Sequence, residues 1–196
     1  MKDDDPGPTA PARRHRILRA AERLFIHYGP AKTTMGDIAR SVGVGVGSLY
    51  LDFTSKDEIV SELAAEKSRF VAARMRDAAG SAPPGPERLA AALAGRVIAL
   101  LDLASGGEHA CDLMRCSKSR DFSLGEEPRA VVRELIEEGK AKGELSVDDA
   151  EQVIDTVELA FGCLSPPFVY RLERPVAEQK ARHLAQMIAR GLAASR

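Results

Sequence analysis

The sequence lacks several features that would assign it to a class of protein at once. It contains no run of eighteen consecutive apolar residues, so no transmembrane helix is predicted. Residues 2–6 are charged or proline and no apolar core follows them, which excludes a secretory signal. The three cysteines are few and odd in number, which does not fit a disulfide framework. Together these absences predict a reduced, cytoplasmic protein that does not contact a membrane.

An excess of charge of either sign is also missing. The 28 Lys/Arg and 29 Asp/Glu give a net charge of −1, so nothing in the whole chain indicates a nucleic acid. The 44% hydrophobic and 29% charged residues describe an ordinary globular chain of one or two domains. Residues 6–60 differ locally, because eight Lys/Arg stand there against five Asp/Glu, a difference of three. This excess is either ordinary surface charge or, beside a DNA-binding motif, a surface that faces phosphates.

Residues 33–56 predict two short helices joined by a glycine turn. Thr34 can cap the first helix, since its hydroxyl can accept a hydrogen bond from a free N–H of the first turn. Gly43 supplies the chain reversal that a side chain would hinder. Each helix has apolar residues at helical spacing: Met35, Ile38, Ala39 and Val42 in the first, then Val44, Leu49 and Phe53. The pattern is a helix-turn-helix, whose second helix would enter a DNA major groove.

These residues resemble the signature of the TetR family of transcriptional regulators. The matching residues are Thr34, Ile38-Ala39, Gly43-Val44, Gly47-Ser48-Leu49-Tyr50, Phe53 and Ser55-Lys56, within residues 16–59. The resemblance implies an all-α fold of about nine helices, three of which form the DNA-binding domain. The others would form a helical effector-binding and dimerisation domain. We accordingly expect a tail at residues 1–12, a DNA-binding domain at 13–56 and the second domain at 57–196.

Helical periodicity outside the motif agrees with that plan. A first helix is expected over residues 13–28, with early arginines near the DNA backbone. A long helix should follow from Ser55, with Ser55 and Glu58 as a capping box, and end at the Pro-rich segment 81–86. Its predicted buried stripe is Ile59, Leu63, Phe70 and Met75. The long helix would belong to both domains and could transmit a ligand-driven change.

The remaining helices are expected at residues 87–104, 108–118, 128–143, 146–164 and 176–192. Ser146 should cap the fourth of these. The residues expected to be buried in the last are Leu184, Met187, Ile188 and Leu192. The resemblance implies that the last two helices pair with those of a second copy as a four-helix bundle. The alternative is that their apolar faces fill the core of a monomer.

The resemblance also implies where double-stranded DNA would bind. The implied DNA-binding residues are Thr33, Thr34, Met35, Gly45, Val46, Gly47, Ser48, Tyr50 and Lys56. Thr34, Tyr50 and Lys56 would hold phosphates, whereas Met35, Val46, Gly47 and Ser48 would face base edges. Tyr50 and Ser48 could alternatively be a core residue and a plain helix residue. The glycines at 43, 45 and 47 do not form a nucleotide loop, because the third glycine of that fingerprint is missing and no strand precedes it.

This recognition helix departs from the family pattern at Gly45, Val46 and Asp52. Residues 43–53 contain no Arg, Lys, Asn or Gln, so no side chain there can make a bidentate base contact. Val46 would then touch thymine methyl groups, and further specificity would come from DNA shape. Arg40 could add a contact to the DNA backbone. A carboxylate would repel phosphate, so Asp52 is expected to have a structural role or a salt-bridge partner.

An effector pocket is expected among the helices of the second domain. The candidate lining residues are Phe70, Leu113, Met114, Phe122, Leu135, Val157 and Phe161, although each could instead be plain core. Because they are apolar, a small hydrophobic or aromatic effector is predicted. His109, Cys111 and Cys116 form no metal-ligand spacing, so neither a metal nor a cofactor is predicted.

We therefore expect a homodimeric repressor that binds a palindromic operator and is released by its effector. A helical DNA-binding protein without effector control is the alternative. A helical enzyme is a further alternative that lacks support, because no nucleophile motif or phosphate loop occurs and no catalytic residue is predicted. A protein that coats DNA without specificity fits poorly with the neutral charge and the large second domain.

Overall fold

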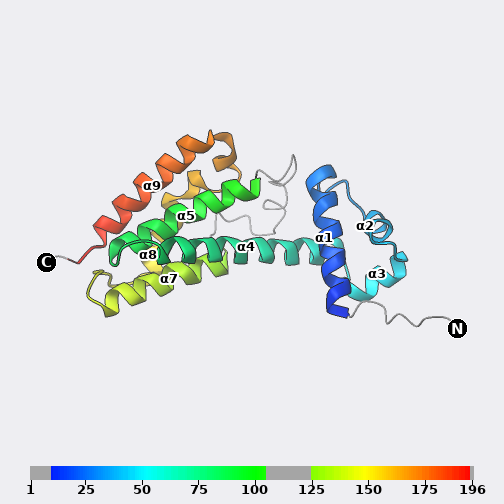
Figure 1. Cartoon of the computed structure of the whole chain (residues 1–196), viewed down its shortest axis with the longest axis horizontal. Coiled ribbons are helices and arrows are strands. Elements are labelled where there is room, and N and C mark those ends of the chain that lie inside the picture. Colours follow the sequence, from blue (N-terminus) through cyan, green and yellow to red (C-terminus); the bar gives the residue numbers. More distant parts are fainter. Residues whose placement is uncertain (1–9, 105–124, 195–196) are drawn as a thin grey trace. The chain divides into compact units, whose positions relative to one another are not determined.

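The computed structural model describes residues 10–104 and 125–194, which confirm the all-α prediction (Figure 1). These residues contain eight α-helices and two short 3₁₀ helices, with no strand beyond an isolated bridge between Leu145 and Ala193. The helix expected at 108–118 lies outside the described residues, as do His109, Cys111, Leu113, Met114, Cys116 and Phe122. No helix in the described part of the chain is long and apolar enough to cross a membrane.

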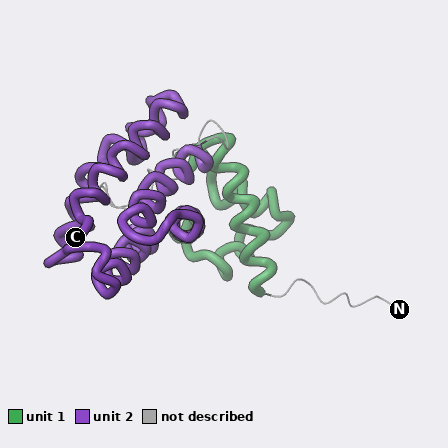
Figure 2. The backbone as a smooth tube through the Cα atoms, turned by 60° about the vertical axis from the view of Figure 1, so that its left-hand side comes forward, with its two compact units in different colours: residues 1–64, 106–117 green, residues 65–105, 118–196 purple. Residues whose placement is uncertain are grey.

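The chain divides into two compact units, and the division falls within helix α4 between residues 64 and 65 (Figure 2). The described part of unit 1 is residues 10–64, and that of unit 2 is residues 65–104 and 125–194. Helix α4 spans Lys56–Gly80, as its sequence predicted, and supplies residues to both units. The functional assignment of the two units stays a prediction.

Unit 1 contains helices α1 (Ala10–Tyr28), α2 (Met35–Val42) and α3 (Val46–Asp52), with the first turns of α4. Its apolar core takes residues from all four helices, including Ile17, Phe25, Ile38, Leu49, Phe53, Ile59 and Leu63, each with no exposed surface. Helix α1 begins three residues before the predicted start and ends where Gly29 adopts φ +82°. These long-range apolar contacts hold two very short helices that would not be stable alone.

The start of α4 differs from the predicted capping box. Ser55 does cap the helix, since its hydroxyl accepts a hydrogen bond from the Glu58 N–H at 3.1 Å. The Glu58 carboxylate, however, accepts from the N–H and hydroxyl of Thr54 at 2.7 and 2.9 Å rather than from Ser55. Because Thr54 precedes Ser55, these bonds fasten the α3–α4 loop to the first turn of α4. They also hold the pKa of the Glu58 carboxyl below its usual value.

Unit 2 is a helical bundle. Its further elements are α5 (Pro86–Ala104), α7 (Glu126–Ala141), α8 (Ala150–Ala160), the 3₁₀ helices η1 (Gly162–Leu164) and η2 (Phe168–Arg171), and α9 (Arg174–Gly191). Helix α5 packs along α9 and also contacts α7 and η2. It approaches α4 so closely that a Cβ added at Gly95 would lie 2.9 Å from the Cβ of Ala78. Helix α8 begins later than predicted, because Asp149 rather than Ser146 caps it and accepts from the N–H groups of Glu151 and Gln152.

Two of the predicted buried faces are partly wrong. On α4, Ile59, Leu63 and Met75 are buried as predicted, whereas Phe70 is 40% exposed. Val71 and Ala72, the next two residues, are buried in its place. On α9, Met187 is 60% exposed, and Leu184, Ile188 and Leu192 are only partly buried. Small residues four apart are buried there instead, namely Ala177, Ala181, Ala185 and Ala189. Alanines allow the closely packed contact with α5, which larger side chains would prevent.

Candidate nucleic-acid interface

Helix α2 begins at a complete capping box. The Thr34 hydroxyl accepts from the Asp37 N–H at 3.2 Å, and the Asp37 carboxylate accepts from the Thr34 N–H at 3.0 Å. The same carboxylate also accepts from the Thr34 hydroxyl at 2.6 Å. These hydrogen bonds to the charged form lower the pKa of the Asp37 carboxyl. The predicted cap at Thr34 is thus confirmed, with Asp37 as its reciprocal partner.

Gly43 makes the turn between α2 and α3, as predicted. Its φ of +77° and ψ of 34° lie in the left-handed region, which a side chain disfavours. Its N–H donates to the carbonyls of Ala39 and Arg40, and the next N–H, from Val44, also donates to Ala39. These bonds satisfy carbonyls that the end of α2 would leave without a partner. The turn fixes the angle at which α3 leaves α2.

Helix α3 has one buried and one exposed face. Leu49 is fully buried and Ser48 is partly buried, whereas Val46 and Gly47 are exposed. Tyr50 is 50% exposed, which contradicts its alternative assignment as a core residue. Leu51 is 85% exposed and joins the same face, although it was not among the predicted DNA-binding residues. Leu51 stands four residues after Gly47 and so lies on the same side of the helix, a spacing that could have identified it from the sequence.

Two arginines of α1 hold the C-terminal part of α3. The Arg13 guanidinium donates to the Ser48 carbonyl at 2.7 Å and lies 2.7 Å from the Asp52 carboxylate. Arg14 donates to the carbonyl of Asp52. Cations stabilise a helix at this end, where the carbonyls carry partial negative charge. The predicted structural role of Asp52 is confirmed by this ion pair.

Arg14 also joins α3 to α4. Its guanidinium lies 3.0 Å from the Glu58 carboxylate, pairs with Glu62 and stacks 3.9 Å above the ring centre of Phe53. Hydrogen bonds to Glu62 and Glu58 raise the pKa of Arg14. The expectation that the early arginines of α1 lie near DNA phosphates therefore needs correction, because Arg13 and Arg14 are bound within the domain. Four of the eight cations of residues 6–60 form ion pairs within the domain, namely Arg13, Arg14, Arg19 and Arg40.

Lys56 has a similar internal role. Its ammonium donates to the carbonyls of Pro30 at 2.7 Å and Thr33 at 3.0 Å, which fastens the α1–α2 loop to the start of α4. An ammonium has three N–H groups, so one remains for a phosphate. The Thr33 side chain is buried and donates to the carbonyl of Gly29, and Met35 is buried in the core. These two side chains position the motif instead of lying on its surface.

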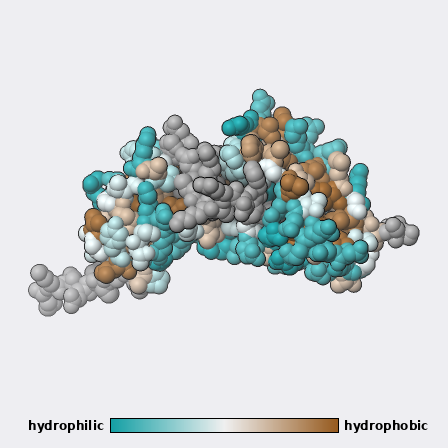
Figure 3. Space-filling model, turned by 180° about the vertical axis from the view of Figure 1, so that it is seen from behind, coloured by the Kyte–Doolittle hydropathy of each residue, from teal (hydrophilic) through white to brown (hydrophobic). Residues whose placement is uncertain are grey.

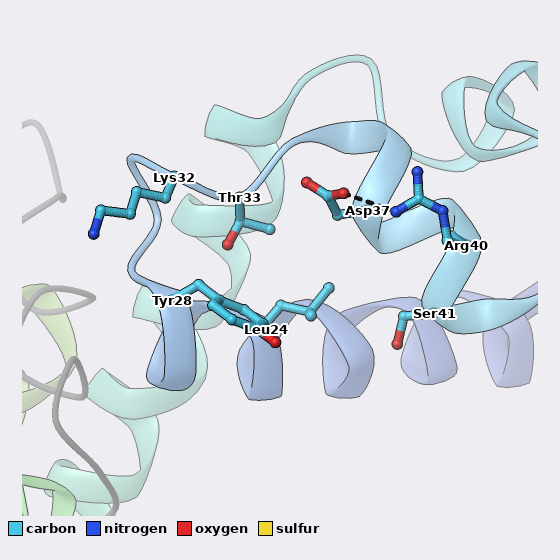
Figure 4. Close-up of a pocket in the computed structure, with 7 residues that line it drawn as sticks. All are labelled: Leu24, Tyr28, Lys32, Thr33, Asp37, Arg40 and Ser41. Carbon is cyan, nitrogen blue, oxygen red and sulfur yellow. Dashed lines mark hydrogen bonds and ion pairs between the residues drawn. The ribbon is translucent and has the colours of Figure 1, made fainter.

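A groove of about 420 Å³ lies on unit 1 between α1 and α2 (Figure 4). Seven residues line it: Leu24, Tyr28, Lys32, Thr33, Asp37, Arg40 and Ser41. The Arg40 guanidinium lies 3.1 Å from the Asp37 carboxylate, whereas Lys32 and Tyr28 are exposed at the surface of the domain. The groove combines cations and hydroxyl groups with an apolar floor, which suits a polar partner better than a purely hydrophobic one.

The predicted effector-pocket residues that the structure describes all belong to unit 2. Val157 and Phe161 are buried, Leu135 is partly buried and Phe70 is exposed. Their burial alone does not distinguish a ligand wall from core packing, so this set stays a prediction. Among the described residues no group of three His, Cys, Asp or Glu side chains is arranged to hold a metal ion.

Comparison with known proteins places the N-terminal residues in a family. Residues 17–63 match the family model described as bacterial regulatory proteins, tetR family. The chain is 40% identical over 78 residues to the transcriptional repressor KstR2 of Mycobacterium tuberculosis, covering 40% of this chain and 39% of that protein. It is 46% identical over 50 residues to the transcriptional regulator TtgR of Pseudomonas putida. These residues are 26% of this chain and 24% of that protein. The matched part is thus well under two thirds of these relatives, which are named as regulators and not as enzymes.

Solved structures extend the likeness of fold to the whole chain. A protein of unknown function from Rhodococcus sp. RHA1 superposes with a TM-score of 0.74 at 18% identity, covering 98% of this chain and 100% of that one. A putative TetR-family transcriptional regulator from Mesorhizobium loti superposes with a TM-score of 0.72 at 17% identity. The superposition covers 95% of this chain and 99% of that one. At these identities the likeness concerns the fold alone. The match to the tetR family of bacterial regulatory proteins therefore covers residues 17–63, which include the motif of residues 33–56.

Proposed function

We propose that this protein is a homodimeric transcriptional repressor of the cytoplasm, which binds an operator in double-stranded DNA through α2 and α3. One observation carries the proposal. Helix α3 presents Val46, Gly47, Tyr50 and Leu51 on one exposed face, while Leu49 and the arginines of α1 fix its other side. A short helix held this rigidly, with an unobstructed face, is suited to insertion in a major groove.

The exposed face of α3 carries no charged side chain, which determines how it would read DNA. Val46 and Leu51 can contact thymine methyl groups, and the Tyr50 hydroxyl can donate to a phosphate. Gly47 allows the backbone to approach the base edges closely. Sequence preference would therefore come from apolar contacts and DNA shape, with few hydrogen bonds to bases.

Dimer formation would use the outer faces of α8 and α9. Leu159 of α8 and Val176 and Met187 of α9 are large apolar side chains left exposed, whereas the alanine face of α9 is already packed on α5. Apolar residues are exposed on part of unit 2 in the surface view (Figure 3). Two copies would place two α3 helices about 34–36 Å apart, and the operator would be palindromic. A small effector bound in unit 2 would release the dimer from its operator.

The test begins with selection of binding sites from random double-stranded DNA by the full chain. Fluorescence anisotropy at fixed salt then compares the selected site with a scrambled one. We expect a palindrome, with binding at least 1,000-fold tighter than to scrambled DNA, as is typical of specific regulators. Failure to enrich any sequence, or equal affinity for both DNAs, would contradict the proposal.

Two variants assign roles on the α3 face. Val46→Ala should change the preferred bases, whereas Tyr50→Phe should weaken binding to selected and scrambled DNA alike. Tyr28→Phe is the matched control, because Tyr28 is similarly exposed but lies on α1. Lys56→Ala is less informative, since it also releases the carbonyls of Pro30 and Thr33.

A further inference from the structure

Unit 2 contains a buried guanidinium with incomplete hydrogen bonding. Arg96 lies in the middle of α5 and is only 4% exposed. Its Nη2 donates to the hydroxyl of Ser165 at 3.0 Å, and that hydroxyl donates in turn to the carbonyl of Phe161 at 2.9 Å. Its Nη1 is buried and has no hydrogen-bond partner. Nearly all buried polar groups in proteins are hydrogen-bonded, so this nitrogen requires an explanation.

The charge of Arg96 is also poorly matched by its surroundings. No described carboxylate forms an ion pair with it, and the nearby Glu158 already lies 2.9 Å from Arg129. Burial lowers the pKa of Arg96 to about 10, although Glu158 and Tyr170 act in the opposite direction. Other arginines of unit 2, such as Arg76 with Glu134, are more exposed and have carboxylate partners. Arg96 is therefore a buried cation whose only hydrogen-bond partner among the described residues is a neutral hydroxyl.

The helix itself gives no structural reason for a cation at this position. The residues on the same side of α5 are Leu89, Ala92, Leu93 and Leu100, all buried and apolar. An apolar side chain of similar length would fill the space without the desolvation cost of a guanidinium. A buried, incompletely satisfied donor is expected where a ligand completes the hydrogen bonds. The N–H groups of a guanidinium match the two oxygens of a carboxylate.

We propose that Arg96 anchors the carboxylate of an otherwise apolar effector bound within unit 2. This inference rests on the proposed effector control and specifies the class of molecule as an organic carboxylate instead of a wholly apolar compound. Ser165 is a positioning residue, since its bonds to Arg96 and to the Phe161 carbonyl fix the orientation of the guanidinium. The apolar part of the effector would lie against the apolar residues of the bundle.

The probes for the test are sodium octanoate and sodium benzoate, with octanamide and benzamide as uncharged counterparts. Calorimetry and thermal melting measure their binding to the full chain in the absence of DNA. At least one carboxylate should bind, and bind at least tenfold more tightly than its amide. Binding of neither carboxylate, or equal affinity for acid and amide, would overturn the inference.

Variants then identify the anchor. Arg96→Met should reduce affinity for the carboxylate at least tenfold, leave affinity for the amide unchanged, and melt at or above the wild-type temperature without ligand. Arg76→Met is the matched control on an exposed, ion-paired arginine and should bind the carboxylate like the wild type. A lower ligand-free melting temperature for Arg96→Met, or a failure of this variant to fold, would overturn the inference, since it would show a structural role.

Arg96→Lys is the second variant, and it tests the geometry of the anchor separately from its charge. Lysine keeps the charge but cannot present the two parallel N–H groups, so carboxylate affinity should fall while the fold is kept. Unchanged affinity would overturn the inference. Operator binding, measured separately, distinguishes the two proposals: DNA binding without carboxylate binding refutes only the anchor, and the reverse result refutes only the proposed function.

Discussion

The turn of the helix-turn-helix can be tested with two identical substitutions four residues apart. Apart from the adjacent residues and the backbone of the same helix, no heavy atom lies within 4 Å of a Cβ added at Gly43 or Gly47, so alanine causes no clash at either site. The sites differ in backbone conformation, because Gly43 has φ +77° whereas Gly47 lies within α3. The effect of each alanine on stability is therefore purely conformational.

The two substitutions should change the stability of unit 1 in opposite directions. Alanine in the left-handed region costs about 1–2 kcal/mol, of which about 0.4–1 kcal/mol is offset by the reduced entropy of the unfolded chain. Gly43→Ala should thus destabilise unit 1 by about 1 kcal/mol. Gly47→Ala should stabilise it by roughly 0.5–1 kcal/mol, because alanine is the better helix former.

Native-state hydrogen exchange of the α2 and α3 amides measures these free energies, because it reports opening of this unit alone. Circular dichroism at 222 nm gives the accompanying thermal melts, as the sequence has no tryptophan for fluorescence. Gly47→Ala should also weaken operator binding, since its methyl group would stand on the exposed face of α3. If both substitutions stabilised unit 1, or both destabilised it, the assignment of strain to Gly43 alone would be refuted.

Three further predictions concern the contacts around this site and the dimer. Arg14→Met should lower the stability of unit 1 by about 1–3 kcal/mol through lost hydrogen bonds and ring stacking, measured by hydrogen exchange, yet leave the salt dependence of DNA binding unchanged. A steeper or shallower salt dependence would show that Arg14 does contact phosphate. The lowered pKa of Asp37 stabilises α2 above the ordinary carboxyl pKa of 3.8, and this contribution is lost as pH falls through the lower folded value. Asp37→Asn should therefore show a smaller loss of melting temperature on acidification than the wild type, and an equal loss would exclude the capping carboxylate as a cause. Met187→Arg should convert a dimer into a monomer by light scattering while helix content is kept, and an unchanged mass would show that this part of α9 is not the interface.

Much of the fold and the scaffold of the site could be predicted, because their signals are local. The cap at Thr34, the turn at Gly43 and the bounds of α4 depend on residues within one or two helical turns of each other. The apolar spacing around Ile38 and Leu49 likewise identified the buried side of the motif. The error at the start of α8 was local too, since Asp149 stands close to Ser146 and either can cap a helix.

The partners of the charged residues required the tertiary structure. Arg14 meets Glu62, 48 residues further along the chain, and Lys56 reaches back 26 residues to Pro30. A basic residue next to a DNA-binding motif has the same sequence signature whether it faces a phosphate or a carboxylate. Distant chain segments brought together by the apolar core decide between the two, because charged groups pair with whatever lies within a few ångströms.

The sequence by itself determined the helical class, the helix-turn-helix and an α3 face without charged side chains. The tertiary structure alone decided which side of α9 is buried, since this helix has one stripe of large apolar side chains and another of alanines. Close packing on α5 selects the alanines and leaves Met187 exposed. It also decided that Arg96 is buried, because the bundle encloses the whole of one side of α5 whatever residue stands there.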